Sequence, residues 1–83
     1  LICEDEAFAD AVARAAETML PGLSDAARAS WRDFSAVVIA PLTEAAGIVN
    51  MIAPEHVEIA TDAPDKVAGD IRHAGAIFLG RWA

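Results

Sequence analysis

Apolar residues recur at helical spacing over two stretches in the first half of the chain. A helix over residues 5–20 would carry four apolar residues on one side, namely Phe8, Val12, Ala15 and Met19. Pro21 and Gly22 come directly after this stretch and are expected to end the helix. Ser24 is a favourable N-cap residue, so the pattern predicts a second, shorter helix over residues 24–32.

Short apolar runs alternate with helical segments in the second half. Runs of the kind found in buried strands occupy residues 36–39 and 76–79, and a short alternating run occupies residues 57–59. The segments between them predict a helix over residues 42–52 and another with Pro64 in its first turn. Gly75 follows that last helix and is expected to adopt the left-handed conformation of a C′ residue.

This order of elements predicts an α/β fold with a short, mostly parallel sheet. Strands that alternate with helices form crossover units, in which helices cover both faces of a parallel sheet. The pattern predicts three strands, and residues 1–2 resemble the end of a fourth. We therefore expect residues 1–83 to form one partial domain, a three-layer sandwich with an exposed sheet edge.

Charge and cysteine content narrow the classes of function. The chain has 13 acidic and 6 basic residues and a net charge of −7, which argues against nucleic acid and anionic membranes as partners. Its apolar runs are shorter than the ~20 residues of a spanning helix. The single cysteine, Cys3, excludes an internal disulfide and is expected to be an apolar filler rather than a nucleophile. These features favour a cytoplasmic protein.

The residues of greatest chemical interest are Glu55 and His56, which follow Pro54 in a predicted turn. A glutamate can deprotonate a water molecule, and a histidine can transfer protons near neutral pH. The alternative is a solvated connection between a helix and a strand, which the pattern alone favours. The position also argues against a site, because ligands of open parallel sheets gather at the carboxyl ends of strands and this pair precedes its strand. A site here would need groups from another domain or subunit.

Three segments resemble the histidinol dehydrogenase family. Residues 50–59, NMIAPEHVEI, are similar to a signature of that family, in which leucine usually replaces Val57. Residues 71–80, IRHAGAIFLG, resemble the segment that follows it, and residues 5–9 and 29–33, DEAFA and ASWRD, resemble the segment that precedes it. Ser35 departs from the family, which often has glycine there. The resemblance extends over essentially the whole chain in matching order and spacing.

The resemblance implies a zinc-dependent, NAD-linked oxidation of L-histidinol to L-histidine through the aldehyde, the last step of histidine biosynthesis. It implies that Glu55 activates water for aldehyde oxidation and that His56 transfers protons and contacts the substrate. It also implies a Rossmann-like domain in a homodimer whose site combines several domains and both subunits. The zinc ligands of the family and its cofactor-contacting segments have no counterpart here, so we expect an internal segment that is inactive alone.

Two alternatives remain open. The chain could belong to a related dehydrogenase that oxidises another hydroxy compound, with Glu55 and His56 serving a different substrate. It could also be a non-enzymatic remnant that associates with itself through the exposed sheet edge. A substrate panel would separate the first alternative from histidinol oxidation, and the oligomeric state of the purified chain would test the second.

Overall fold

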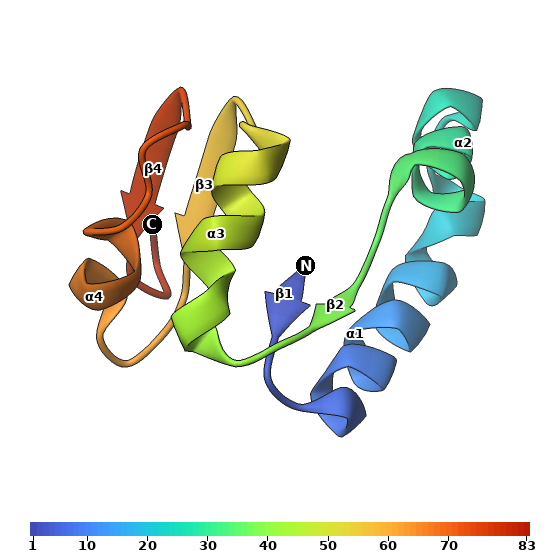
Figure 1. The fold of residues 1–83 in the computed structure, drawn as a ribbon. Coiled ribbons are helices and arrows are strands. Elements are labelled where there is room, and N and C mark those ends of the chain that lie inside the picture. Colours follow the sequence, from blue (N-terminus) through green and yellow to red (C-terminus); the bar gives the residue numbers. More distant parts are fainter. The chain divides into compact units, whose positions relative to one another are not determined.

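The computed structural model describes residues 1–83, which divide into two units, Leu1–Ala40 and Pro41–Ala83. The elements alternate between strands and helices, and the ribbon is shown in Figure 1. Each unit contains one pair of parallel strands. The expected α/β class with short parallel strands is confirmed, and the layout is compatible with part of a Rossmann-like domain.

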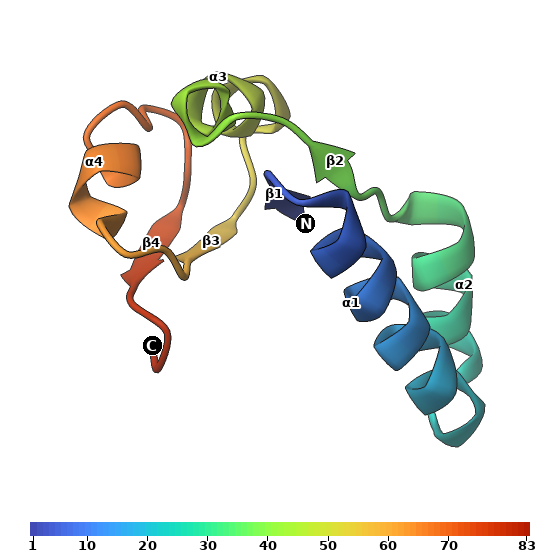
Figure 2. The same ribbon diagram turned by 90° about the horizontal axis from the view of Figure 1, so that it is seen from below.

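The first unit connects its two strands through two helices. Strand β1 (Ile2–Cys3) pairs in parallel with β2 (Val38–Ile39). Between them lie α1 (Glu6–Met19), the 3₁₀ turn η1 (Leu20–Gly22) and α2 (Asp25–Phe34). The turn η1 reverses the chain, so that α2 runs back in the direction from which α1 came (Figure 2). The strand predicted over residues 36–39 is shorter than expected, because β2 begins only at Val38.

Side-chain caps fix the starts of α1 and α2. The Asp5 carboxylate accepts a hydrogen bond from the Ala7 N–H at 2.9 Å, and the Ser24 hydroxyl accepts one from the Ala27 N–H at 3.2 Å. Such caps satisfy backbone donors that have no partner within the helix. The structure thus confirms Ser24 as the N-cap that the sequence predicts.

The apolar side predicted for the first helix is wrong in detail. Phe8 and Met19 are 50% and 65% exposed, whereas Ala9 is buried at 3%. Val12 is half-buried, as are two alanines that share its side of α1, Ala13 and Ala16. Small side chains let the backbone of a helix approach its neighbour closely, so the inward face of this unit centres on alanine rather than on the larger residues.

The second unit consists of two helices and a strand pair. Helix α3 (Leu42–Ile52) precedes β3 (His56–Ile59), and α4 (Pro64–Ala68) precedes β4 (Ala76–Leu79). The two strands run parallel, with His56 opposite Ala76 and Ile59 opposite Leu79. The core contains Ala45, Ala46 and Val49 of α3 together with Ile59. Figure 2 shows α3 and α4 on the same face of this strand pair.

The predicted left-handed conformation of Gly75 is wrong. Positive φ angles occur at Ala53, with φ 50°, and at Gly80, with φ 96°. Helix α4 ends at Ala68, seven positions before Gly75, so Gly75 does not act as its C′ residue. Gly75 instead lies beside the backbone of Glu55, a relationship that sequence periodicity does not report.

Candidate functional site

The Glu55–His56 pair lies at the amino end of β3. His56 is the first residue of the strand, one position earlier than predicted, and Glu55 lies in the turn before it. Side chains alternate between faces only within a strand, so the step from Glu55 to His56 does not force the two onto opposite sides. Both residues are exposed, and the Glu55 carboxylate forms no hydrogen bond or ion pair within the chain.

The turn that carries the pair begins with an unusual backbone conformation. Ala53 ends α3 in the left-handed region, with φ 50° and ψ 57°, and its N–H donates to the Val49 carbonyl at 2.8 Å. The following Pro54 disfavours a right-handed helical conformation at Ala53, which is consistent with the end of the helix there. A left-handed alanine costs free energy that glycine would not, and such residues cluster at functional sites.

Backbone groups at the start of β4 hold this turn from one side. The N–H of Gly75 donates to the Pro54 carbonyl at 3.1 Å, and the N–H of Ala76 donates to the Glu55 carbonyl at 2.8 Å. A Cβ atom at Gly75 would lie 2.6 Å from the Glu55 carbonyl oxygen, closer than real Cβ contacts allow. Glycine is therefore required at position 75 for the close approach of two backbones.

The His56 ring packs against an aromatic residue of the neighbouring strand. The ring centroids of His56 and Phe78 are 5.8 Å apart with an interplanar angle of 75°, an edge-to-face arrangement. In this parallel register Phe78 lies two residues beyond Ala76, the partner of His56, and therefore on the same face. This contact restricts the orientation of the imidazole while leaving His56 exposed.

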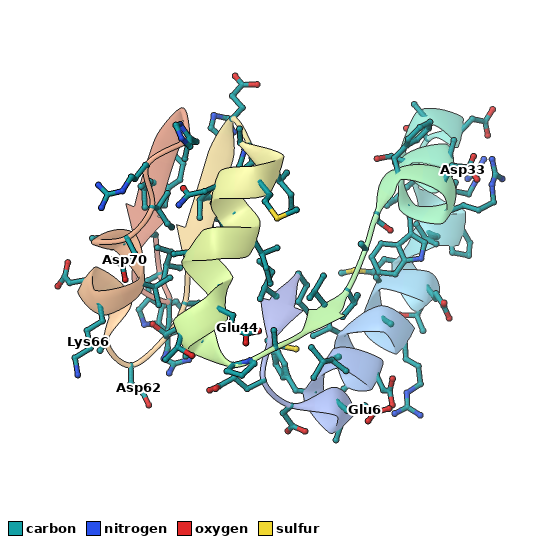
Figure 3. The ribbon with its side chains drawn as sticks, in the orientation of Figure 1. Glu6, Asp33, Glu44, Asp62, Lys66 and Asp70 are labelled. Carbon is teal, nitrogen blue, oxygen red and sulfur yellow. The ribbon has the colours of Figure 1, made fainter.

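A cavity of about 390 Å³ lies at the opposite, carboxyl end of β3. Residues from the start of α3, from the β3–α4 connection and from α4 line it, among them Thr43, Thr61 and Lys66. Figure 3 shows Asp62 on the loop before α4, Lys66 on α4 itself and Asp70 just after it. Glu55 and His56 do not line this cavity, so the pair lies on the exposed surface of this unit, away from the cavity.

The residues of this chain do not assemble a metal site. Across the described residues 1–83, no three His, Cys, Asp or Glu side chains gather in a position to hold a metal ion. A protein zinc site needs at least three such ligands. The donor set of the chain therefore does not fit zinc, and no chemical step is assigned to zinc here.

None of the helices combines the length and the apolar character that crossing a membrane requires.

Comparison with known proteins gives the family. The sequence model of histidinol dehydrogenase matches residues 1–83. The chain belongs to the histidinol dehydrogenase family. It is 55% identical to a histidinol dehydrogenase of Caulobacter vibrioides in an alignment of 83 positions, which covers 98% of this chain and 19% of that protein. It is 51% identical to the Rhizobium meliloti protein, with the same coverage, and 49% identical to that of Rhodospirillum rubrum, over 99% of this chain and 20% of the relative.

This chain of the histidinol dehydrogenase family thus spans about a fifth of the length of these relatives. The family match confirms the resemblance that the sequence predicts. The sequence gives Asn50 no role of its own, although the residue stands first in the segment 50–59 that resembles a family signature. The structure shows its side chain hydrogen-bonded to three backbone groups of residues 70–73. A signal was present, because Asn50 is the one polar side chain in the otherwise apolar stretch 45–52 of α3.

Proposed function

We propose that this chain supplies the acid/base pair of a histidinol dehydrogenase, which oxidises L-histidinol to L-histidine through the aldehyde. The observation that carries the proposal is the family match over residues 1–83 together with an exposed Glu55–His56 turn held by backbone hydrogen bonds. In this proposal His56 removes the hydroxyl proton of the alcohol as a general base. NAD, when bound, accepts a hydride in each of the two oxidations.

Glu55 acts between the two oxidations. Its carboxylate takes a proton from the water molecule whose oxygen attacks the aldehyde carbon, while the carbonyl oxygen takes the proton that His56 holds after the first oxidation, which produces the hydrated aldehyde and returns His56 to its basic form. The exposed carboxylate, free of partners within the chain, is available to such a water molecule. His56 then removes a hydroxyl proton of the hydrate during the second oxidation. Its contact with Phe78 holds the ring in one orientation for both steps.

The remaining parts of the site lie elsewhere in the proposed enzyme. Glu55 and His56 are exposed and do not line the cavity of this unit. They also belong to no group of side chains that could hold a metal ion. We therefore assign zinc and NAD binding to other segments, and propose that further substrate contacts come from other domains and from the second subunit of a homodimer. The reaction is a biosynthetic one, and we place it in the cytoplasm.

The test requires a full-length host enzyme. We define this host as the Caulobacter vibrioides relative in which these 83 residues replace the matching segment, a substitution made feasible by 55% identity. The host should oxidise both L-histidinol and L-histidinal. Glu55→Gln should lower the rate of aldehyde oxidation by about 10²–10⁴-fold and affect alcohol oxidation less, because only the aldehyde step needs an activated water.

His56→Asn should slow both oxidations, since both need a proton acceptor for a hydroxyl group. Equal losses in the two steps for Glu55→Gln would contradict its assignment, and activity on other hydroxy compounds but not on histidinol would favour a related dehydrogenase. The isolated 83-residue chain should form no NADH from histidinol, even with zinc added. NADH formation by that chain would show that it holds a complete site.

A further inference from the structure

Asn50 connects the end of α3 to the segment that leads into β4. Its side-chain amide donates to the Asp70 carbonyl at 3.0 Å, and its carbonyl oxygen accepts from the N–H groups of Arg72 at 2.7 Å and His73 at 3.1 Å. The side chain is half-buried, so water competes for these bonds less than at a fully exposed position. One residue thus satisfies three backbone groups that lie 20 to 23 positions away.

The segment held by Asn50 leads directly to the turn that carries the proposed acid/base pair. Two residues after His73, the N–H of Gly75 donates to the Pro54 carbonyl, and the next N–H, that of Ala76, donates to the Glu55 carbonyl. Ala76 is also the register partner of His56. The backbone of Glu55 and His56 is therefore fixed between the end of α3 and a segment whose position depends on the Asn50 amide.

We propose that Asn50 is a positioning residue for the Glu55–His56 pair, acting through the backbone of residues 70–76. This inference rests on the proposed function, because the pair must be catalytic for its position to affect the rate. Asn50 itself lies three positions before Ala53 on α3 and makes its contacts with backbone groups of residues 70–73, so its side chain takes no proton from the substrate. Its effect is to hold the reacting groups in place, where a displacement of about 1 Å can lower a rate by about 10²-fold.

The experiment uses the host enzyme with three variants. Asn50→Ala removes all three hydrogen bonds, and Asn50→Asp keeps an acceptor for Arg72 and His73 but loses the donor to Asp70. Asp62→Ala is the matched control, because it removes the ion pair with Arg81 at the carboxyl end of the same strand pair. Rates are expressed per folded enzyme, with the folded fraction taken from circular dichroism.

Asn50→Ala should lower kcat by about 10²-fold while changing KM for histidinol less than about threefold, since binding groups elsewhere remain in place. Asn50→Asp should recover about tenfold of this loss, and Asp62→Ala should leave kcat unchanged. In the double variant Asn50→Ala with Glu55→Gln, the loss of aldehyde oxidation should be smaller than the product of the two single losses, because part of the Asn50 effect acts through Glu55.

An unchanged kcat per folded molecule in Asn50→Ala would overturn the inference and leave Asn50 with a structural role only. Losses that multiply in the double variant would overturn it as well. Failure of the proposed function gives a different result, in which Glu55→Gln and His56→Asn themselves leave both oxidations unchanged.

Discussion

Gly75 lies so close to Glu55 that a Cβ atom at position 75 would be 2.6 Å from the Glu55 carbonyl oxygen and 3.4 Å from its Cα. Two segments separated by some twenty positions therefore meet backbone to backbone at the turn that presents the proposed acid/base pair. At this contact the amino ends of β3 and β4 pair in register, with His56 opposite Ala76.

Gly75→Ala should disturb this turn. The added methyl group meets backbone atoms, which cannot rotate away as a flexible side chain can, so the Glu55 peptide must shift. In the host enzyme we expect faster amide hydrogen exchange over residues 53–59 and a loss of aldehyde oxidation of about tenfold or more. Gly47→Ala is the matched control, because nothing lies within 4 Å of its added Cβ. It should preserve activity, and equal effects of the two variants would refute the steric explanation.

Ala53→Gly should stabilise the end of α3. Glycine adopts the left-handed conformation seen at Ala53 without a Cβ penalty, so we expect a gain of about 0.5–1 kcal/mol. The measurement is the exchange rate of the residue 53 amide, which donates to the Val49 carbonyl and should exchange about two to five times more slowly. Ala53→Val should have the opposite effect, because a β-branched residue is strongly disfavoured at positive φ. Slower exchange in Ala53→Val would contradict this account.

Phe78→Ala should loosen the His56 imidazole. The edge-to-face contact at 5.8 Å contributes about 0.5–1.5 kcal/mol, and its loss lets the ring sample other orientations. We expect both oxidations in the host enzyme to slow by about threefold to tenfold, as His56 is proposed to act in both. Ile77→Ala is the control on the same strand but on the opposite face, where Ile77 is the register partner of Val57. A greater loss of oxidation rate in Ile77→Ala would show that the stability of the strand, and not the contact with His56, causes the effect.

Ser24→Ala should weaken the start of α2. Its hydroxyl accepts a hydrogen bond from the Ala27 N–H at 3.2 Å, and removal of such a cap costs about 1 kcal/mol. Amides in the first turn of α2 should therefore exchange about fivefold faster in hydrogen-exchange mass spectrometry. Ser30→Ala changes an exposed serine inside the same helix and should have no comparable effect. Unchanged exchange in Ser24→Ala would show that packing alone fixes this helix end.

Local sequence signals determined the order of the elements. Ser24, the Pro21–Gly22 pair and Pro54 act on their immediate neighbours, so helix starts and stops could be predicted from the chain itself. Apolar runs in the same way predicted the strands that became β3 and β4. The family signature also singled out Glu55 and His56, because that match depends only on the identity and order of residues.

Only the tertiary structure decided what surrounds that pair. The sequence predicts a left-handed conformation at Gly75, which is wrong, because periodicity describes one segment at a time and cannot report that another backbone passes beside it. The three hydrogen bonds of Asn50 and the contact of His56 with Phe78 likewise join residues more than 19 positions apart. The sequence by itself determined which residues could carry acid/base chemistry. Parallel strand register, a non-local property, decided which backbone groups hold them in place.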